Sequence, residues 1–525
     1  MVKNVAEIKR VIPLMLIGIF GSLFIYYGAF IPTPPTFGDE PFLWLIAKSY
    51  AEGNFKYIPR LYADGPYEGE GQYLFKPMLY ELIPTFFYLI SFGNFSIYKL
   101  FSPIFGILLL FAVYYYTKKY LGVEYGLIAM AMCAGVPLLV HFTLLSYHNI
   151  PLTFFFFIAC FKTLDYLNNP TRKNLILAGI FFGLSLSVSK LILSVPLSFA
   201  LFLLITHNFR VIEILKSKEF KSFILITLIG FAVCSPWMIR NTIMFHNPFY
   251  PEVQFISTYR INKKMWDIKA SIAKTPLSEI FSFGTLNAYM GYYFFPILIG
   301  IAYSIYKWDK NNLLLLSFIA TGLIVVLFIA TKDIRYIMHL VPLSVFLFCS
   351  FLKEFLPDFK YKTHILLLLV VVCIFIFAFE IRESGKRIND LRALTPSILE
   401  AYKWLATNTT NAEYNILDLF TPRALLLLYY FDPSNQRGVT FPHPHAGSGE
   451  VLWHFWEYPD ARQRLKSCKI KYIVVEKYFF TVPYQMRKFI GWTHLPEEFV
   501  KWADDKPYME RVFENRDMLI YEVEL

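Results

Sequence analysis

Long apolar runs recur through the first 380 residues of this chain, and they limit its fold more than any other feature. They extend over 15 to 20 residues and are separated by short polar groups. A helix needs about 20 apolar residues to cross the roughly 30 Å hydrocarbon layer of a bilayer. The charged share of 17% agrees with a membrane location, because soluble domains carry about 25%. The sequence therefore predicts a multi-pass integral membrane protein.

We predict eleven membrane spans and one shorter apolar segment. The first span, Val11–Phe30, has no small-residue cleavage site after it, so we expect it to be retained and not removed as a signal peptide. The segment Met78–Phe92 is short and interrupted by Pro84, and we place it at the membrane face. The other spans are expected at 97–116, 124–141, 150–167, 174–188, 191–206, 222–239, 286–306, 312–330, 335–352 and 363–380.

Basic residues indicate the orientation of these spans. They gather in alternate loops, which is typical of the cytoplasmic side. We therefore expect the N-terminus inside, and the loop 31–96, the loop 240–285 and all residues after Phe379 outside. The net charge of +11 thus reflects membrane topology and not nucleic-acid binding. The basic loops hold Lys118 and Lys119, Arg172 and Lys173, residues 210–221, Lys307 and Lys310, and residues 353–362.

The composition changes at about Glu380, where charged residues become frequent. Short helix-like and strand-like segments then alternate, which is typical of a small α/β domain. We predict a mainly α fold: a transmembrane helical bundle of about 11 spans in residues 1–380, with the long outer loop 31–96. A soluble extracytoplasmic α/β domain is expected in residues 381–525, and the whole chain in the plasma (cell) membrane. Its helices are expected at 397–406 and 461–467, and its strands at 414–419, 471–475 and 518–523.

An acidic pair, Asp39 and Glu40, follows the first span on the outer side. Adjacent carboxylates do not share a helix face, so one can point into a crevice while the other holds the backbone. An ionisable group at such a crevice loses hydration and often marks function. The alternative is a helix cap, because Asp is favoured just before a helix and Pro41 stands just inside it.

Lys76 lies where the outer loop returns to the membrane, and three further cations, Lys190, Arg240 and Arg335, are expected at the outer ends of spans. Positive charge there runs against the bias of membrane proteins, so a shared explanation is needed. An anionic ligand supplies one, since Arg can bind a phosphate with two parallel N–H groups. The alternatives are snorkelling of Lys76 to the membrane surface and pairing of Arg335 with Asp333.

The order of these motifs resembles the GT-C superfamily of polytopic glycosyltransferases, in particular the branch of protein O-mannosyltransferases and lipid A aminoarabinose transferases. The resemblance covers about residues 11–380, and the end of the chain is like the α/β domains appended to many members. It rests on the acidic pair, Lys76-Pro77, the segment Gly183–Lys190, Pro236-Trp237-x-x-Arg240-Asn241, the segment Asn247–Pro251, and Arg335-Tyr336.

The resemblance implies an enzyme that moves a hexosyl or pentosyl group from a polyprenyl-phosphate donor to an acceptor hydroxyl on the outer face. The acceptor would be a protein, a lipid or a glycan, and membrane lipids are the other expected partners. The acidic residue of the family's first outer loop matches Asp39, which would act as general base beside Glu40. The four cations would neutralise the donor phosphate as its charge develops, in a single displacement with inversion.

One departure from the family pattern concerns His148 and Asn149, which form the secondary site of this prediction. Many relatives carry a second acid where Asn149 stands, and Asn is neither a base nor a strong metal ligand. No cofactor follows from the motifs, and a divalent metal is left open but not favoured. His443, His445 and His454 offer metal ligands, but no Cys or carboxylate completes a set, so a surface loop is favoured.

Two other functions stay open at this stage. A transporter or flippase of a lipid-linked anion would use the same cations, although it should carry internal repeats and charges near the bilayer midplane. A non-catalytic membrane assembly subunit is the other alternative, and only Asn149 favours it.

Overall fold

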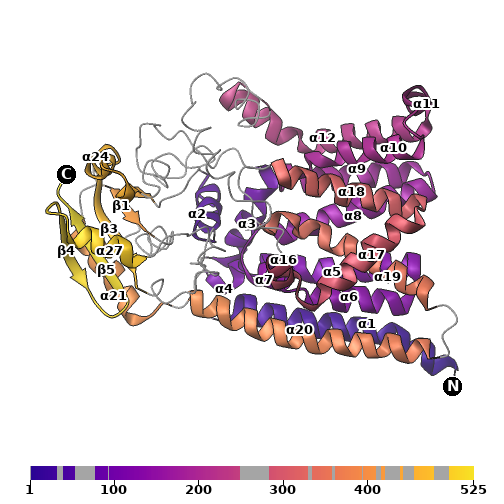
Figure 1. Cartoon of the computed structure of the whole chain (residues 1–525), viewed down its shortest axis with the longest axis horizontal. Helices are drawn as coiled ribbons and strands as arrows, with labels where there is room; N and C mark the ends of the chain where they lie inside the picture. The colour runs from indigo at the N-terminus through magenta and orange to yellow at the C-terminus, as the bar shows by residue number, and fades with distance from the viewer. Residues whose placement is uncertain are drawn as a thin grey trace. The chain divides into compact units, whose positions relative to one another are not determined.

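The computed structural model divides the chain into two compact units (Figure 1). Unit 1 comprises Met1–Pro32, Lys76–Ile83 and Ser96–Ile388, and unit 2 comprises Thr33–Phe75, Pro84–Phe95 and Asn389–Leu525. The structure describes residues 2–31, 40–53, 77–92, 94–246, 248, 283–328, 334–356, 361–392, 394–409, 415–419, 438–440, 455–477 and 496–525. Asp39, Lys76, Asp333, His443, His445 and His454 lie outside the described residues.

Unit 1 is a bundle of apolar helices, and three of the helices given below also contain residues of unit 2, namely 84–91, 95 and 389–392. Each predicted span overlaps a described helix or consecutive helical elements separated at most by a short break, and the segment at 78–92 is also helical. The elements are α1 (Val2–Ile25), η1 (Tyr26–Phe30), α3 (Met78–Ser91), α4 (Phe95–Tyr98), α5 (Phe101–Leu121), α6 (Val123–Gly135), α7 (Pro137–Leu144), α8 (Asn149–Asn168), α9 (Arg172–Leu186), η2 (Lys190–Leu193), α10 (Ser194–Thr206), α11 (Val211–Lys216), α12 (Lys218–Phe245), α16 (Phe283–Met290), η4 (Gly291–Tyr293), α17 (Phe294–Lys307), α18 (Lys310–Phe328), η5 (Ile334–Leu340), α19 (Val341–Phe355) and α20 (Lys362–Arg392).

Within the described residues, six helical segments are long and apolar enough to cross a membrane. The pair α6 and α7, bent by 64°, makes a seventh if it forms one span. Met78–Ser91, Lys190–Thr206 and Lys310–Val326 are apolar but shorter, so the count of eleven stays a prediction. The six segments are Val11–Phe30, Phe95–Leu121, Asn149–Asn168, Lys218–Ile243, Arg335–Phe355 and Lys362–Asn389.

Helices α1 and α20 run side by side in the bundle (Figure 1). Helix α20 has a buried apolar side that packs on α1 and an exposed apolar side. Phe377 of α20 is buried and meets the rings of Phe20 and Phe24 at 4.6 and 5.5 Å between centroids. On the same helix Leu367 and Phe375 are 61% and 72% exposed. A helix that is apolar on its packed side and on its open side is suited to lipid, where the open side meets acyl chains. The chain is therefore an integral membrane protein.

The backbones of α9 and α12 approach closely at Gly183 and Gly230. A Cβ added to Gly183 would lie 2.5 Å from the Cβ of Val233 and 2.6 Å from the carbonyl oxygen of Gly230. Membrane helices have no hydrophobic drive toward each other in lipid, so small residues that let backbones approach are a main source of packing energy. This contact fixes the position of the α9–η2 turn, which carries Lys190.

Unit 2 contains a five-stranded mixed sheet in the order β2-β1-β3-β5-β4. β1 pairs in parallel with β2 and β3, whereas β5 pairs antiparallel with β3 and β4. The strands are β1 (Asn415–Asp418), β2 (Gly438–Thr440), β3 (Ile470–Glu476), β4 (Met509–Glu514) and β5 (Met518–Val523). The predicted strands match β1, β3 and β5, while β2 and β4 were not predicted.

Helices cover both faces of this sheet, which confirms the predicted α/β class. α21 (Pro396–Asn408) packs Ile398, Tyr402 and Leu405 on one face. On the other face, η6 (Phe455–Glu457), α24 (Ala461–Ser467) and α27 (Pro496–Asp504) contribute Phe455, Leu465 and Phe499 to a second cluster.

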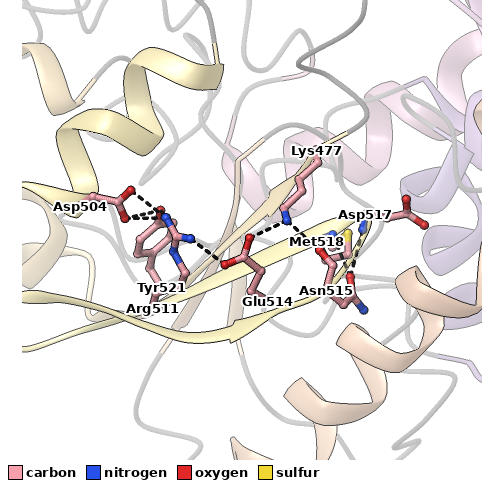
Figure 2. A network of polar contacts seen from close by, with 8 residues as sticks. All are labelled: Lys477, Asp504, Arg511, Glu514, Asn515, Asp517, Met518 and Tyr521. Atoms are coloured by element: carbon pink, nitrogen blue, oxygen red, sulfur yellow. Dashed lines mark hydrogen bonds and ion pairs between the residues drawn. The ribbon is translucent and has the colours of Figure 1, made fainter.

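The β4–β5 hairpin carries a network of charged contacts (Figure 2). Arg511 donates from its Nη2 to both carboxylate oxygens of Asp504, at 2.9 and 2.7 Å, and from its Nη1 to Glu514 at 2.6 Å. Lys477 donates to the other oxygen of Glu514 at 2.7 Å, and the Tyr521 hydroxyl donates to Asp504 at 2.9 Å. The hydrogen bonds from Lys477 and Arg511 lower the pKa of the Glu514 carboxyl. The network therefore links β4 and β5 to α27 and to the end of β3.

Candidate functional site

Glu40, the second acid of the pair after the first span, begins helix α2 (Glu40–Ala51) in unit 2. Its carboxylate pairs with Arg392, which donates from Nε to Oε2 at 3.0 Å and from Nη2 to Oε1. Both side chains are 0% exposed. A carboxylate held by both sides of a guanidinium has a fixed orientation. The pair therefore anchors the start of α2, and Asp39 directly precedes that start in the sequence.

Helix α2 is held at a second place by aromatic packing. The ring of Trp44 lies 5.4 Å from that of Tyr88 and 5.8 Å from that of Phe95, between centroids. Leu45 packs against the α21 side of the sheet core. All of these residues belong to unit 2. The segment that follows Asp39 thus rests on a folded support within this unit.

The N-terminal turn of α3, directly after Lys76, connects several predicted site residues in unit 1. The backbone N–H groups of Leu79 and Tyr80 donate to the carbonyl oxygen of Ser187 at 2.7 and 3.3 Å. Ser187 ends α9, and Lys190 begins η2 three residues later with an exposed side chain. These bonds hold the start of α3 beside the turn that leads into η2 and Lys190.

Arg240 joins the same turn through an ion pair with Glu81. Its Nη1 donates to Oε2 of Glu81 at 2.9 Å, and the exposed fractions of the two side chains are 20% and 1%. The sequence prediction placed Arg240 at a phosphate but did not anticipate Glu81. Because a guanidinium has five N–H donors in a rigid fork, a carboxylate on one side sets the direction of the others.

His148 and Arg335 complete this end of the bundle. The ring of His148 lies 4.2 Å from that of Tyr80, between centroids. The guanidinium carbon of Arg335 lies 6.0 Å from the ring centroid of Tyr147 and 5.5 Å from that of Tyr336, within the range of cation–π contacts. Arg335 is thus held over aromatic rings beside the turn that leads into α8.

Asn149 is the first residue of α8 and is 1% exposed. In the described part of the chain, its side-chain oxygen is buried and accepts no hydrogen bond. A buried acceptor without a donor costs about 1–3 kcal/mol, so the position is suited to an incoming donor group. The position therefore offers a neutral acceptor.

Sequence reasoning missed Glu81, Arg392, Lys99 and the aromatic partners. Lys99 is 0% exposed and donates to the carbonyl oxygen of Ile31 at 2.8 Å, at the end of the first span. A lone lysine at the start of an apolar run was a signal that could have found it. Glu81 and Arg392 gave no such signal, because each is an ordinary charge near a helix end.

Within unit 1, Arg240 and His148 contact residues of the first turn of α3, and Lys190 follows Ser187, which also contacts it. Arg335 and Asn149 are linked to this turn through Tyr147 and His148. A cation supported by aromatic rings, a guanidinium oriented by a carboxylate and an exposed lysine are together suited to a phosphate group and the charge that grows on it. Among the described residues, no group of three His, Cys, Asp or Glu side chains could hold a metal ion.

The fold and this site define a polytopic membrane protein with cationic side chains near one end of its helical bundle. Residues 76–239 match the family model of dolichyl-phosphate-mannose-protein mannosyltransferases. The matched stretch contains His148, Asn149 and Lys190 and ends one residue before Arg240. No curated protein shows a significant sequence match.

Two solved structures share the fold of this chain. The archaeal oligosaccharyltransferase AglB from Archaeoglobus fulgidus, in complex with an inhibitory peptide and a dolichol-phosphate, is 13% identical with a TM-score of 0.60, and the match covers 90% of this chain and 71% of AglB. ArnT from Cupriavidus metallidurans, bound to undecaprenyl phosphate, is 10% identical with a TM-score of 0.61, over 99% and 98% of the two chains. The resemblance drawn from the sequence is confirmed: the chain has the fold of the GT-C superfamily of membrane glycosyltransferases.

Proposed function

We propose that this chain is a membrane glycosyltransferase that moves a sugar from a polyprenyl-phosphate donor to an acceptor hydroxyl. The observation that carries the proposal is the series of contacts that links Arg240, the α9–η2 turn before Lys190, and His148 to the N-terminal turn of α3, with Arg335 stacked on the neighbouring Tyr147. The matched family and the two solved relatives support it, since dolichol-phosphate or undecaprenyl phosphate is named with all three.

The proposed reaction is a single displacement. Asp39 accepts the proton of the acceptor hydroxyl, whose oxygen forms a bond to the anomeric carbon of the sugar. The bond between that carbon and the phosphate oxygen breaks, and the electron pair leaves with the polyprenyl phosphate. The configuration at the anomeric carbon is therefore inverted.

The cations stabilise the leaving group in this scheme. Fixed donors aimed at developing charge act more strongly in the transition state than in the ground state, and they need no reorganisation. Glu81 directs the guanidinium of Arg240, and the rings of Tyr147 and Tyr336 support Arg335. The role of Glu40 in this proposal is structural. Its hydrogen bonds to Arg392 fix the first residue of α2, directly after Asp39 in the sequence.

We place the reaction on the outer face of the cell membrane, with unit 2 extracytoplasmic. The alternation of basic loops supports this orientation, because it puts the loop with Asp39 on the side opposite to the basic groups. The acceptor class is a protein, lipid or glycan hydroxyl. The buried oxygen of Asn149 offers a hydrogen-bond acceptor to such a group.

The test is turnover of radiolabelled polyprenyl-phosphate sugars by purified protein in detergent, with release of sugar to water counted as turnover. We expect Asp39→Asn to reduce release by about 10²- to 10⁴-fold, the usual contribution of a general base. Glu52→Gln is the matched control, because Glu52 follows α2 and is 59% exposed in its pair with Lys48.

Two outcomes would count against the proposal. Binding of donor lipid by the wild-type protein without any release would favour transport or a non-catalytic assembly subunit. Equal sugar release by wild type and Asp39→Asn would support the transferase activity but show that Asp39 is not the general base.

A further inference from the structure

A pocket of about 440 Å³ lies in unit 1 where four helices end or begin. It is formed by the end of α10, the start of α12, the turn between α17 and α18, and the first residues of α18. Its volume is within the roughly 300–1,000 Å³ of small-molecule sites. None of the motifs that led to the proposed function lies in it.

This pocket is at the opposite end of the bundle from the candidate site. Helix α12 contributes Glu219 to the pocket and Arg240 to the candidate site. The two positions are 21 residues apart on one helix, or about 31 Å at 1.5 Å per residue. That length equals the roughly 30 Å hydrocarbon layer of a bilayer, so the pocket lies at the other membrane surface.

The lining combines an apolar part with opposite charges. Phe202 and Leu313 are buried side chains of α10 and α18, and they form the apolar part. Lys310 and Glu219 line the polar part and face each other at 3.4 Å, with exposed fractions of 53% and 34%. His207 also lines the pocket. A bound group thus finds a cation, a carboxylate and an imidazole on one side of an apolar wall.

Exposed apolar side chains border the pocket along the chain. Between α10 and α12, Phe209, Ile212 and Leu215 are 68%, 70% and 54% exposed. Trp308, in the turn before α18, lines the pocket and is 52% exposed. Aromatic and apolar groups beside basic residues are typical of the zone where lipid headgroups meet acyl chains. The pocket therefore opens where a headgroup, and not a free solute, is at high concentration.

We propose that this pocket binds the headgroup of a phospholipid that carries both a phosphate and a hydrogen-bond donor, from the leaflet opposite to the candidate site. Lys310 and His207 bind the phosphate, and Glu219 accepts from the hydroxyl or ammonium group of the headgroup. Basic pockets between membrane helices are known to bind anionic headgroups. The carboxylate adds a preference, because a headgroup with no donor leaves Glu219 without a ligand partner.

The experiment titrates short-chain lipids into the purified full-length protein in detergent and counts bound lipid by native mass spectrometry. The probes are phosphatidylglycerol, phosphatidylethanolamine and phosphatidylcholine, of which the last has no donor. We expect the first two to bind about five- to tenfold more tightly than phosphatidylcholine. Lys310→Gln should weaken the binding of all three lipids by about the same factor. Glu219→Gln should remove the preference for phosphatidylglycerol and phosphatidylethanolamine and leave the binding of phosphatidylcholine unchanged.

Lys307→Gln is the matched control, because Lys307 lies at the same end of the bundle and pairs with Glu354 outside the pocket. An equal effect of Lys307→Gln and Lys310→Gln would overturn the proposal in favour of a diffuse surface charge. Equal binding of the three lipids by the wild-type protein would overturn it as well. Soluble glycerophosphoglycerol separates the sources: binding as tight as that of the lipid would show a site for free phosphoesters and refute a lipid site.

Discussion

Replacing Arg392 with methionine is expected to destabilise unit 2 by about 3–5 kcal/mol, the usual cost of breaking a buried ion pair by removing one partner. Both Arg392 and Glu40 are 0% exposed, so neither can regain its hydration when the other is removed. The guanidinium contributes two hydrogen bonds to the carboxylate. Glu40→Gln keeps the shape of the side chain but leaves the buried cation without its counter-charge, so a loss of similar size is expected.

The double substitution separates this reasoning from a general loss of packing. If the cost arises from an unpaired buried charge, the Glu40→Gln, Arg392→Met protein should be no less stable than either single variant. The two single losses would then add to far more than the loss of the double variant. The matched control is Glu400→Gln on α21, which removes an exposed carboxylate from the same unit.

The assay is the apparent unfolding temperature of the purified protein in detergent, measured at one heating rate because membrane proteins often unfold irreversibly. The order expected is wild type, then the double variant, then the single variants. Additive losses in the double variant would refute the reasoning, since they would mean that the two side chains contribute independently. Unchanged stability in Arg392→Met would refute the burial of the pair itself.

Three further changes test other parts of the structure. Arg240→Lys is expected to lower turnover of the polyprenyl-phosphate donor by about tenfold or more, because an ammonium does not reproduce a fork oriented by Glu81; equal turnover by both proteins would contradict the phosphate role. Gly183→Leu should lower the unfolding temperature through overpacking of about 1–3 kcal/mol, whereas Gly18→Leu, with no atom within 4 Å of its added Cβ, should not. Since the folded-state pKa of Glu514 is lowered, its contribution is present above the unfolded value of about 4.3 and lost as pH falls through the folded value. The hairpin should therefore lose up to about 1 kcal/mol on acidification, and Glu514→Gln should remove that part of the pH dependence of thermal unfolding.

The bundle could be predicted because its signal is local. A run such as Val11–Phe30 or 363–380 specifies a helix by length and composition alone, and the structure has helices there. The prediction for Met78–Phe92 used the same reasoning, and the helix found there is only 14 residues long. The number of spans does not follow from the helices alone. The bent pair α6 and α7 can be one span or none, and the shorter apolar helices do not meet the length of a full span.

The sheet was predicted only where its strands are buried. β1, β3 and β5 bury most of their side chains, so their apolar residues form continuous runs. β4 is an edge strand of the described sheet with three exposed side chains, and its sequence Met509–Glu514 has no continuous apolar run because charged residues interrupt it. Such a strand depends on its partner β5 for its structure, so its own sequence carries a weak signal.

Some residues of the candidate site could be predicted from the sequence and others could not. Single residues with unusual placement, such as Arg240 and Arg335, could be selected because outer cations run against the charge bias of membrane proteins. Their partners could not, because Glu81 is 159 positions from Arg240 and Arg392 is 352 positions from Glu40. Tertiary pairing at such separations leaves no trace in one sequence. The sequence therefore suggested which charges have a function but not which charges hold them.

The pairing narrows the choice of general base. Glu40 and Glu81, the acids in the first turns of α2 and α3, each accept hydrogen bonds from a guanidinium and are 0% and 1% exposed. A carboxylate that accepts from a guanidinium has a fixed orientation, and at least one of its oxygens is already engaged. Both acids are therefore suited to positioning a neighbour: Glu81 directs Arg240, and Glu40 fixes the start of α2. In this scheme Glu40→Gln should impair folding and turnover together, whereas Asp39→Asn should impair turnover in a protein that folds and binds donor normally.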